Sequence, residues 1–234
     1  MKLTQVMNGV CKMKNKPLGI LIISFLVAFI GIAVWTFSAG GFPLDKWMLD
    51  WSDTNEGGFV HSVMTFISAF GSSEVILAFT LGIAAFFLYK RFWHHLVLFL
   101  TVSVGGVAVN LLLKLLFRRE RPGEAKEIEV FDFSLNIPSY SFPSGHTMRS
   151  TILICFLMFL IYMYIRNQAL QVSLYAVSIV LMFLVGLSRV FLEAHFASDV
   201  LGALTISIVW FCSVVYVYEA YMDKKESEHI RQRF

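Results

Sequence analysis

Apolar residues run along most of the chain in long stretches, separated by short polar or basic segments. A stretch of about 20 apolar residues is long enough for an α-helix to cross the hydrocarbon core of a bilayer. Backbone polar groups inside a bilayer must be satisfied within the segment, which favours helices. The pattern therefore predicts an all-α fold, a bundle of six transmembrane helices. The predicted spans are 18–37, 74–89, 93–117, 147–165, 170–187 and 200–218.

One apolar stretch, residues 59–70, is too short for this role. We expect it to form a re-entrant or interfacial helix. The break Gly71-Ser72-Ser73 follows it and offers an N-cap for the next helix, and Glu74 suits the positive end of that helix. Trp47 and Trp51 in the preceding loop are expected to anchor the chain at the membrane surface.

The composition supports a membrane protein and excludes an ordinary soluble domain. Hydrophobic residues make up 57% of the chain and charged residues 15%, and the mean hydropathy is +0.70. We expect one membrane domain, residues 18–218, between a basic leader, 1–17, and a charged tail, 219–234. The expected surroundings are a lipid bilayer, with no nucleic-acid partner; protein partners are left open.

The lysines of the leader indicate the orientation. Lys2, Lys12, Lys14 and Lys16 precede the first apolar stretch. A cleaved signal peptide ending at Ser38-Ala39-Gly40 is the alternative, but the apolar stretch is longer than the core of such a peptide. We therefore expect a multi-pass protein of the cell membrane with both termini in the cytoplasm.

With this orientation, several cations fall on the outer side, where the charge rule disfavours them. An anionic ligand would account for them, although the cations of the loop 118–142 can equally be solvated charges. Seven of these outer cations flank the loop 118–142 or lie at nearby helix ends: Lys114, Arg118, Arg119, Arg121, Lys126, Arg149 and Arg189.

The first candidate motif is Lys114 with Arg121-Pro122. A spacing of seven residues is two helical turns, so we expect both side chains on nearly the same face of a helix that Pro122 ends. Two long cationic side chains there could reach one phosphate. Snorkelling side chains at a helix end are the alternative.

The second candidate motif is Pro143-Ser144-Gly145-His146, directly before the span 147–165. Gly145 lets the backbone approach a ligand closely, and Ser144 can cap the helix and donate a hydrogen bond. Free N–H groups at the start of a helix favour an anion. A simple turn with a helix cap is the alternative.

The third candidate motif joins Ser188-Arg189 to His195 and Asp199. His195 and Asp199 are four residues apart, so they share a face if this stretch is helical. A carboxylate on one ring nitrogen leaves the other nitrogen free to attack. Arg189 offers a planar fork for phosphate. A helix cap by Asp199 with a loop histidine is the alternative.

Together the three motifs resemble the signatures of the type 2 phosphatidic acid phosphatase superfamily. They read Lys114-x6-Arg121-Pro122, Pro143-Ser144-Gly145-His146 and Ser188-Arg189-x5-His195-x3-Asp199. The chain looks most like the bacterial phosphatidylglycerophosphatase B branch, which includes undecaprenyl pyrophosphate phosphatases. Glu193 and Ala197 depart from the most usual residues of the third motif. Because they occupy variable positions, they bear on substrate preference and not on catalysis.

The resemblance implies a role for each motif residue. His195 would attack phosphorus and form a phosphohistidine, Asp199 would hold its ring, and His146 would protonate the leaving oxygen. No metal or other cofactor would be required. The phosphate oxygens would be held by Lys114, Arg121, Ser144, Gly145 and Arg189.

The resemblance also implies a membrane lipid phosphate as substrate and an active site at the extracytoplasmic interface. Phosphatidylglycerophosphate and undecaprenyl pyrophosphate are the expected substrates, with phosphatidic acid and diacylglycerol pyrophosphate as alternatives. A vanadate-dependent haloperoxidase would use the same fold, but those relatives are soluble. A non-enzymatic lipid carrier or channel would not explain the His195–Asp199 pair or the separate His146.

Overall fold

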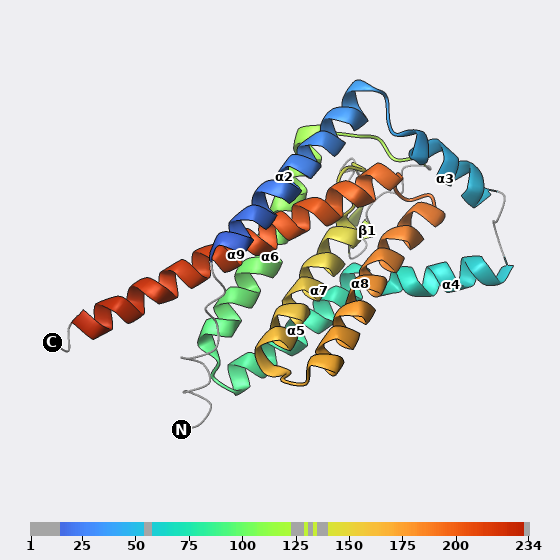
Figure 1. Ribbon diagram of the computed structural model, residues 1–234. Coiled ribbons are helices and arrows are strands. Elements are labelled where there is room, and N and C mark those ends of the chain that lie inside the picture. Colours follow the sequence, from blue (N-terminus) through green and yellow to red (C-terminus); the bar gives the residue numbers. More distant parts are fainter. Residues whose placement is uncertain (1–14, 54–57, 123–128, 131–132, 135–139, 232–234) are drawn as a thin grey trace.

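The computed structural model describes residues 15–53, 58–122, 129–130, 133–134 and 140–231 (Figure 1). The described chain is all-α apart from two two-residue strands, which pair antiparallel between α6 and α7. This confirms the predicted fold class. The leader residues before Asn15, and Lys126, lie outside the described residues. The elements are α2 (Asn15–Ser38), α3 (Pro43–Asp53), α4 (Gly58–Ala69), α5 (Ser73–Tyr89), α6 (Trp93–Phe117), β1 (Glu129–Val130), β2 (Phe133–Ser134), α7 (Gly145–Tyr164), α8 (Gln168–Phe191) and α9 (Ala197–Arg231).

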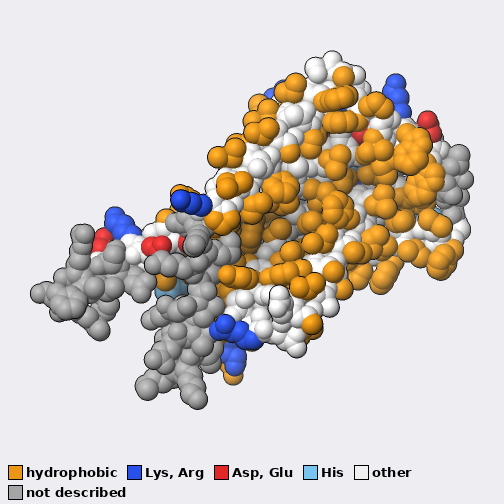
Figure 2. Space-filling view, viewed as in Figure 1, with side chains coloured by type: hydrophobic (Ala, Val, Ile, Leu, Met, Phe, Trp, Pro, Cys, Tyr) orange, Lys and Arg blue, Asp and Glu red, His pale blue; other side chains and the backbone are white. Residues whose placement is uncertain are grey.

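Six helical stretches are long and apolar enough to cross a membrane, as predicted. Hydrophobic side chains cover most of the face seen in Figure 2, and the charged side chains lie toward its ends. Such a surface is stable in lipid, where exposed apolar side chains cost nothing. The six stretches are Lys16–Ser38, Gly58–Tyr89, Trp93–Phe117, Gly145–Tyr164, Gln168–Phe191 and Ala197–Lys224.

The second of these stretches differs from the prediction, because it includes both α4 and α5. The two helices follow each other in roughly the same direction, and α4 packs along α8 (Figure 1). The predicted cap between them is present: the Ser72 side chain accepts a hydrogen bond from the Val75 N–H at 3.2 Å. Helix α5, Ser73–Tyr89, matches the predicted span 74–89, and α4 precedes it as the separate short helix predicted at 59–70.

The last helix is also longer than the predicted span 200–218. It begins at Ala197 and continues to Arg231, through most of the predicted tail. No Gly or Pro occurs after Gly202. Without a helix breaker, the charged residues extend the helix beyond the apolar stretch.

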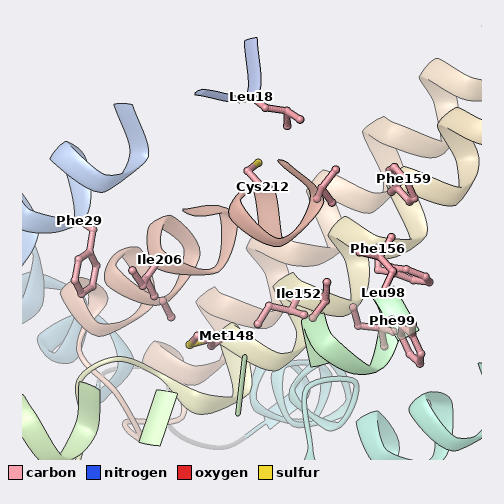
Figure 3. Close-up of a cluster of buried hydrophobic side chains, with 14 of the residues drawn as sticks. Leu18, Phe29, Leu98, Phe99, Met148, Ile152, Phe156, Phe159, Ile206 and Cys212 are labelled. Atoms are coloured by element: carbon pink, nitrogen blue, oxygen red, sulfur yellow. The ribbon is translucent and has the colours of Figure 1, made fainter. Parts of the chain in front are cut away.

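The core lies where α6 and α7 meet α9 (Figure 3). Phe99 and Phe156 are fully buried and their ring centroids are 4.6 Å apart. Gly105 and Gly106 allow close packing of α6, because the Trp210 ring lies against Gly105 and the Ile152 side chain against Gly106.

The bundle brings the three motifs to one end. The C-terminal ends of α6 and α8 and the N-terminal ends of α7 and α9 all lie there, because these neighbouring helices run in alternating directions (Figure 1). The turns between α5 and α6 and between α7 and α8 lie at the opposite end.

Candidate active site

His195 and Asp199 form a buried pair between α8 and α9. His195 Nδ1 lies 3.6 Å from Asp199 Oδ2, with the side chains 1% and 0% exposed. The Ser141 hydroxyl lies 3.3 Å from the same ring nitrogen and donates a hydrogen bond to Asp199 Oδ2. The predicted pairing is present, but its predicted basis is wrong. His195 precedes α9, so the loop before the helix, and not a shared helical face, brings the ring to the carboxylate.

Asp199 is at the same time a helix cap. It is the third residue of α9, and its Oδ2 accepts a hydrogen bond of 2.9 Å from the Phe196 N–H. A carboxylate that bonds back to the residue before a helix stabilises the helix start. Asp199 therefore both caps α9 and faces His195, so the two alternatives considered for this residue are compatible. The capping hydrogen bond helps to fix the orientation of the carboxylate.

The surroundings of His195 favour a neutral ring. Burial lowers the pKa of His195 to about 4, because the charged form loses its hydration, while the contact with Asp199 acts in the opposite direction. The ring is therefore neutral at pH 7 and keeps a lone pair. A nucleophilic imidazole needs that form.

The second motif forms the start of α7. Ser144 is buried, and its Oγ accepts hydrogen bonds from the Thr147 N–H at 3.5 Å and the Thr147 hydroxyl at 3.0 Å, which confirms the predicted cap. A Cβ at Gly145 would lie 3.3 Å from Asn110 Oδ1 and 3.6 Å from Arg149 Nη1. The Ser144 N–H donates to the Asp199 backbone oxygen at 3.1 Å, which joins this motif to the third.

The first motif reaches the site in an unexpected way. α6 ends at Phe117, and Arg118 adopts a left-handed conformation with φ of 49°. The predicted continuous helix to Pro122 is therefore wrong, since the chain leaves the helix before Arg121. Lys114 and Arg121 nevertheless lie close enough to interact electrostatically with each other and with His195. The Lys114 ammonium also donates a hydrogen bond to the Tyr140 carbonyl.

Arg189 approaches the site from the end of α8. Its Nη1 donates a hydrogen bond of 2.6 Å to the Ser68 hydroxyl of α4. Its buried Nε finds no hydrogen-bond partner within the part of the chain that the structure describes. Arg189 and Arg121 are both electrostatic neighbours of His146, as is His195. The two histidines therefore lie in one cation-lined site.

Arg149 is a fourth cation of this site, which the sequence analysis treated only as an outer charge. It is also an electrostatic neighbour of His146, and its buried Nε has no hydrogen-bond partner among the described residues. The signal was its position: Arg149 follows His146 by three residues at the start of a helix, so both side chains lie on the same side of α7.

The other cations of the loop 118–142 differ from one another. Arg118 is exposed and donates to the Leu115 carbonyl at 3.0 Å, as expected for a solvated loop charge. Arg119 is instead almost buried and forms salt bridges with Asp45 and Asp199. The sequence did not single out Asp45, because an aspartate shortly before Trp47 in a predicted loop is typical of a surface residue.

Glu74 and Glu193 lie near the site at its edges. Glu74 is exposed in the first turn of α5, on the side where Arg149 interacts with it electrostatically. Glu193 has a left-handed backbone with φ of 52°, and its Oε1 accepts a hydrogen bond of 3.2 Å from the Ser52 hydroxyl of α3. Glu193 therefore helps to attach α3 to the loop that carries His195.

Residues 95–223, which contain all three motifs, match the family model described as the PAP2 superfamily. The chain belongs to the PAP2 superfamily. Among characterised members, phosphatidylglycerophosphatase B of Bacillus subtilis (strain 168) is 30% identical over 158 residues, which cover 65% of this chain and 72% of that protein. Undecaprenyl-diphosphatase BcrC of the same organism is 26% identical over 193 residues, covering 74% and 92%.

A solved PAP2 structure agrees with this assignment. The transmembrane PAP2 type phosphatidylglycerolphosphate phosphatase from Bacillus subtilis superimposes with a TM-score of 0.68 at 25% identity, over 87% of this chain and 96% of that one. LpxE from Aquifex aeolicus shares the fold, with a TM-score of 0.53 at 20% identity over 75% and 96%. The predicted superfamily and the prediction of a phosphatase are thus confirmed, in preference to a carrier or channel.

Proposed function

We propose that this PAP2 protein removes phosphate from a membrane lipid through a phosphohistidine on His195, without a metal ion. The expected substrates are phosphatidylglycerophosphate and undecaprenyl pyrophosphate. The observation that carries the proposal is the buried His195–Asp199 pair in a site that Lys114, Arg121 and Arg189 approach. The names of the two Bacillus subtilis relatives support lipid phosphates as the substrate class.

The first step forms the covalent intermediate. His195 Nδ1 faces Asp199 and Ser141, which leaves Nε2 as the nitrogen for phosphorus. Nε2 attacks phosphorus, the bond from phosphorus to the lipid oxygen breaks, and His146 gives a proton to that oxygen. The ring of His195 becomes positively charged as it bonds to phosphorus, and Asp199 stabilises that charge.

The second step releases phosphate. Water attacks phosphorus, His146 takes a proton from the water, and the phosphorus–nitrogen bond breaks, which returns His195 to its neutral form. His146 thereby regains the proton that it gave to the lipid oxygen. Apart from the neutral His195, the groups close to His146 that we identify are cationic, so the phosphate supplies the negative charge that stabilises a proton on this ring.

Lys114, Arg121 and Arg189 supply the positive charge that the reaction needs. In the transition state, negative charge is spread over the oxygens of the phosphoryl group, and fixed cations stabilise it. Ser144 and Gly145 would add donors at the start of α7, where the helix favours an anion. Their positions around one site support their proposed role in phosphate binding.

The membrane setting fits a lipid phosphate. The site lies at the ends of candidate spans, where a lipid headgroup would meet it while the tails stay in the bilayer. Lys90, Arg91 and Arg166 occupy the turns at the opposite end. Basic turns favour the cytoplasmic side, so the site would face outward and both termini inward.

A panel of lipids in mixed micelles with EDTA tests the activity. The panel contains phosphatidylglycerophosphate, undecaprenyl pyrophosphate, phosphatidic acid and diacylglycerol pyrophosphate, and kcat/KM is compared among them. Brief reaction with ³²P-labelled substrate should leave acid-labile label on the protein, and His195→Ala should abolish both label and phosphate release. Near-normal turnover by folded His195→Ala would disprove the proposed nucleophile.

The orientation needs a separate test. In a variant without the native cysteines, single cysteines replace Asp50 on α3 or Arg166 between α7 and α8, both exposed. A membrane-impermeant maleimide should label the first in intact cells and the second only after lysis. The reverse pattern would place the site on the cytoplasmic side.

A further inference from the structure

Arg119 lies between two buried carboxylates from distant parts of the chain. Its Nη1 donates a hydrogen bond of 2.6 Å to Asp199 Oδ1, and its Nη2 donates one of 3.0 Å to Asp45 Oδ2. The side chain of Arg119 is 13% exposed, and its guanidinium lies over the Phe196 ring, 4.1 Å from the centroid. A planar guanidinium that is held on two edges and stacked on one face has a single orientation.

Asp45 connects α3 to the start of α9. Its Oδ1 accepts a hydrogen bond of 2.8 Å from the Ser198 N–H, and its Oδ2 accepts one of 2.7 Å from the Ser198 hydroxyl. Asp45 is 2% exposed, whereas Leu44 and Trp47 on the same helix are 41% and 62% exposed. The helix therefore presents apolar side chains outward and one carboxylate inward, next to Asp199.

The contacts around Asp199 show what this arrangement does. Asp199 Oδ2 is occupied by the Ser141 hydroxyl and the Phe196 N–H, and it faces His195. Arg119 is the side chain that holds the other oxygen, Oδ1. Fixing both oxygens prevents the carboxylate from turning away from the ring, so Arg119 sets the orientation on which the pair depends.

The charges of the network give Asp45 a second effect. A cation on Asp199 alone would cancel much of the negative charge that must stabilise the positively charged ring of His195. Asp45 supplies a second negative charge on the far side of Arg119, at 3.0 Å. Two carboxylates and one guanidinium leave one net negative charge for the ring.

We propose that Asp45 and Arg119 are positioning residues for the phosphatase reaction: Arg119 fixes Asp199 beside His195, and Asp45 holds Arg119 and offsets its charge. This inference rests on the proposed function, because it assumes that His195 is the nucleophile. Neither residue is a fixed position of the three motifs, since Arg119 lies in the variable part of the first, and neither is assigned to the binding of phosphate. Their loss should therefore lower kcat and leave KM nearly unchanged.

The experiment uses the full chain in detergent with dioctanoyl phosphatidylglycerophosphate in mixed micelles. Asp45→Asn keeps the shape of the side chain and removes its charge, and the matched control is Asp50→Asn, at an exposed position on the same helix. We expect Asp45→Asn to lower kcat about 10- to 100-fold, the range found when supporting partners of active groups are removed. KM should change by less than about twofold, and Asp50→Asn should match the wild type.

A double-mutant cycle separates positioning from simple support of the fold. Asp45→Asn and Arg119→Gln should be clearly non-additive in kcat, with the double variant little worse than Arg119→Gln alone, because Asp45 acts through Arg119. Fully additive losses would overturn the proposed relay. Arg119→Lys should remain impaired, because one ammonium group cannot hold two carboxylates as the guanidinium fork does.

Failure of the inference is distinguishable from failure of the proposed function. If the wild type releases no phosphate, or His195→Ala remains active, the proposed function is wrong. If the wild type is active and Asp45→Asn equals Asp50→Asn, or changes KM alone, the inference is overturned. If Asp45→Asn does not fold, Ser198→Ala replaces it, because this change removes the hydroxyl that donates to Asp45 and accepts from Arg119. A lower kcat at unchanged KM then supports the inference, and wild-type kcat overturns it.

Discussion

Asp199 Oδ2 lies 3.6 Å from His195 Nδ1, and hydrogen bonds hold both oxygens of this carboxylate. The carboxylate therefore has one orientation, and the ring nitrogen that it faces is set by the fold. This arrangement assigns the two ring nitrogens different tasks: Nδ1 meets the carboxylate and Nε2 is left for phosphorus. It also predicts that the negative charge of Asp199, and not only its shape, matters for turnover.

Asp199→Asn tests the role of that charge. The amide keeps the size of the side chain but can neither hold the ring tautomer nor stabilise a positively charged ring, so we expect kcat to fall about 10⁴-fold, as for the same change in serine proteases. Timed assays of phosphate release measure the loss of kcat, and trapping of ³²P on the protein measures the loss of the intermediate. Asp223→Asn, at an exposed position near the other end of α9, should keep full activity. A loss of less than about tenfold in Asp199→Asn would argue against charge stabilisation.

The pKa of His195 predicts the pH dependence. Because burial lowers this pKa to about 4, the nucleophile stays neutral as the pH falls from 7 to 5, and protonation inactivates it only near pH 4. We therefore expect no loss of kcat/KM from His195 near the ordinary imidazole pKa of about 6.5. The pH profile of kcat/KM is measured with two lipids whose phosphate pKa values differ. An inflection caused by a group of the enzyme should occur at the same pH with both lipids. If such an inflection occurs near pH 6.5 and disappears in His146→Gln, it belongs to His146. If it remains in His146→Gln, it contradicts the prediction for His195.

The packing of α6 on α9 gives a prediction for stability. A methyl group at Gly105 would overlap the Trp210 ring, whose indole N–H donates to the Val102 carbonyl at 2.9 Å. The ring cannot move without losing that bond, so Gly105→Ala should destabilise the protein by about 1–3 kcal/mol. Thermal unfolding in detergent should show a clear decrease in Tm. Gly82→Ala on α5, where a Cβ meets nothing within 4 Å, should show no decrease. Equal Tm values for both variants would mean that the helices can separate there at little cost.

The sequence predicted the helices well because their signal is local. The length of each apolar stretch is visible in the chain itself, and each of the six candidate spans overlaps a predicted one. The separation of α4 from α5 at the Ser72 cap was predicted correctly, although the two helices together form one apolar stretch. The main error lies at the end of the last helix. α9 continued beyond Tyr218 because charged residues without a helix breaker extend a helix that packing has already formed.

The site was predicted in its motifs and missed in its supporting residues. Lys114 and Arg121 were paired for a reason that fails, since the helix ends at Phe117, and tertiary contacts bring them together instead. Arg119 and Asp45 were missed because their relation is entirely long-range. They are 74 residues apart, and no local pattern distinguishes a buried aspartate on α3 from a surface one. Such pairs become visible only when the fold brings α3 onto the start of α9.

Arg149 leads to a prediction about which phosphate is preferred. It adds a fourth cation beside His146, and its buried Nε has no hydrogen-bond partner among the described residues. A diphosphate group carries more negative charge and more oxygens than a monophosphate, so it can use the additional cation. We expect Arg149→Gln to lower kcat/KM for dioctanoyl diacylglycerol pyrophosphate about 10- to 100-fold, the worth of one hydrogen bond to a charged group.

Dioctanoyl phosphatidic acid, which has the same tails and one phosphate fewer, provides the comparison. Its kcat/KM should fall much less in Arg149→Gln, because Lys114, Arg121 and Arg189 remain to hold a single phosphate. Arg166→Gln, in the exposed turn at the other end of α7, controls for the loss of a positive charge and should affect neither lipid. An equal loss for the two lipids would mean that Arg149 supports the site as a whole, and the proposed preference would then have to be sought in other residues.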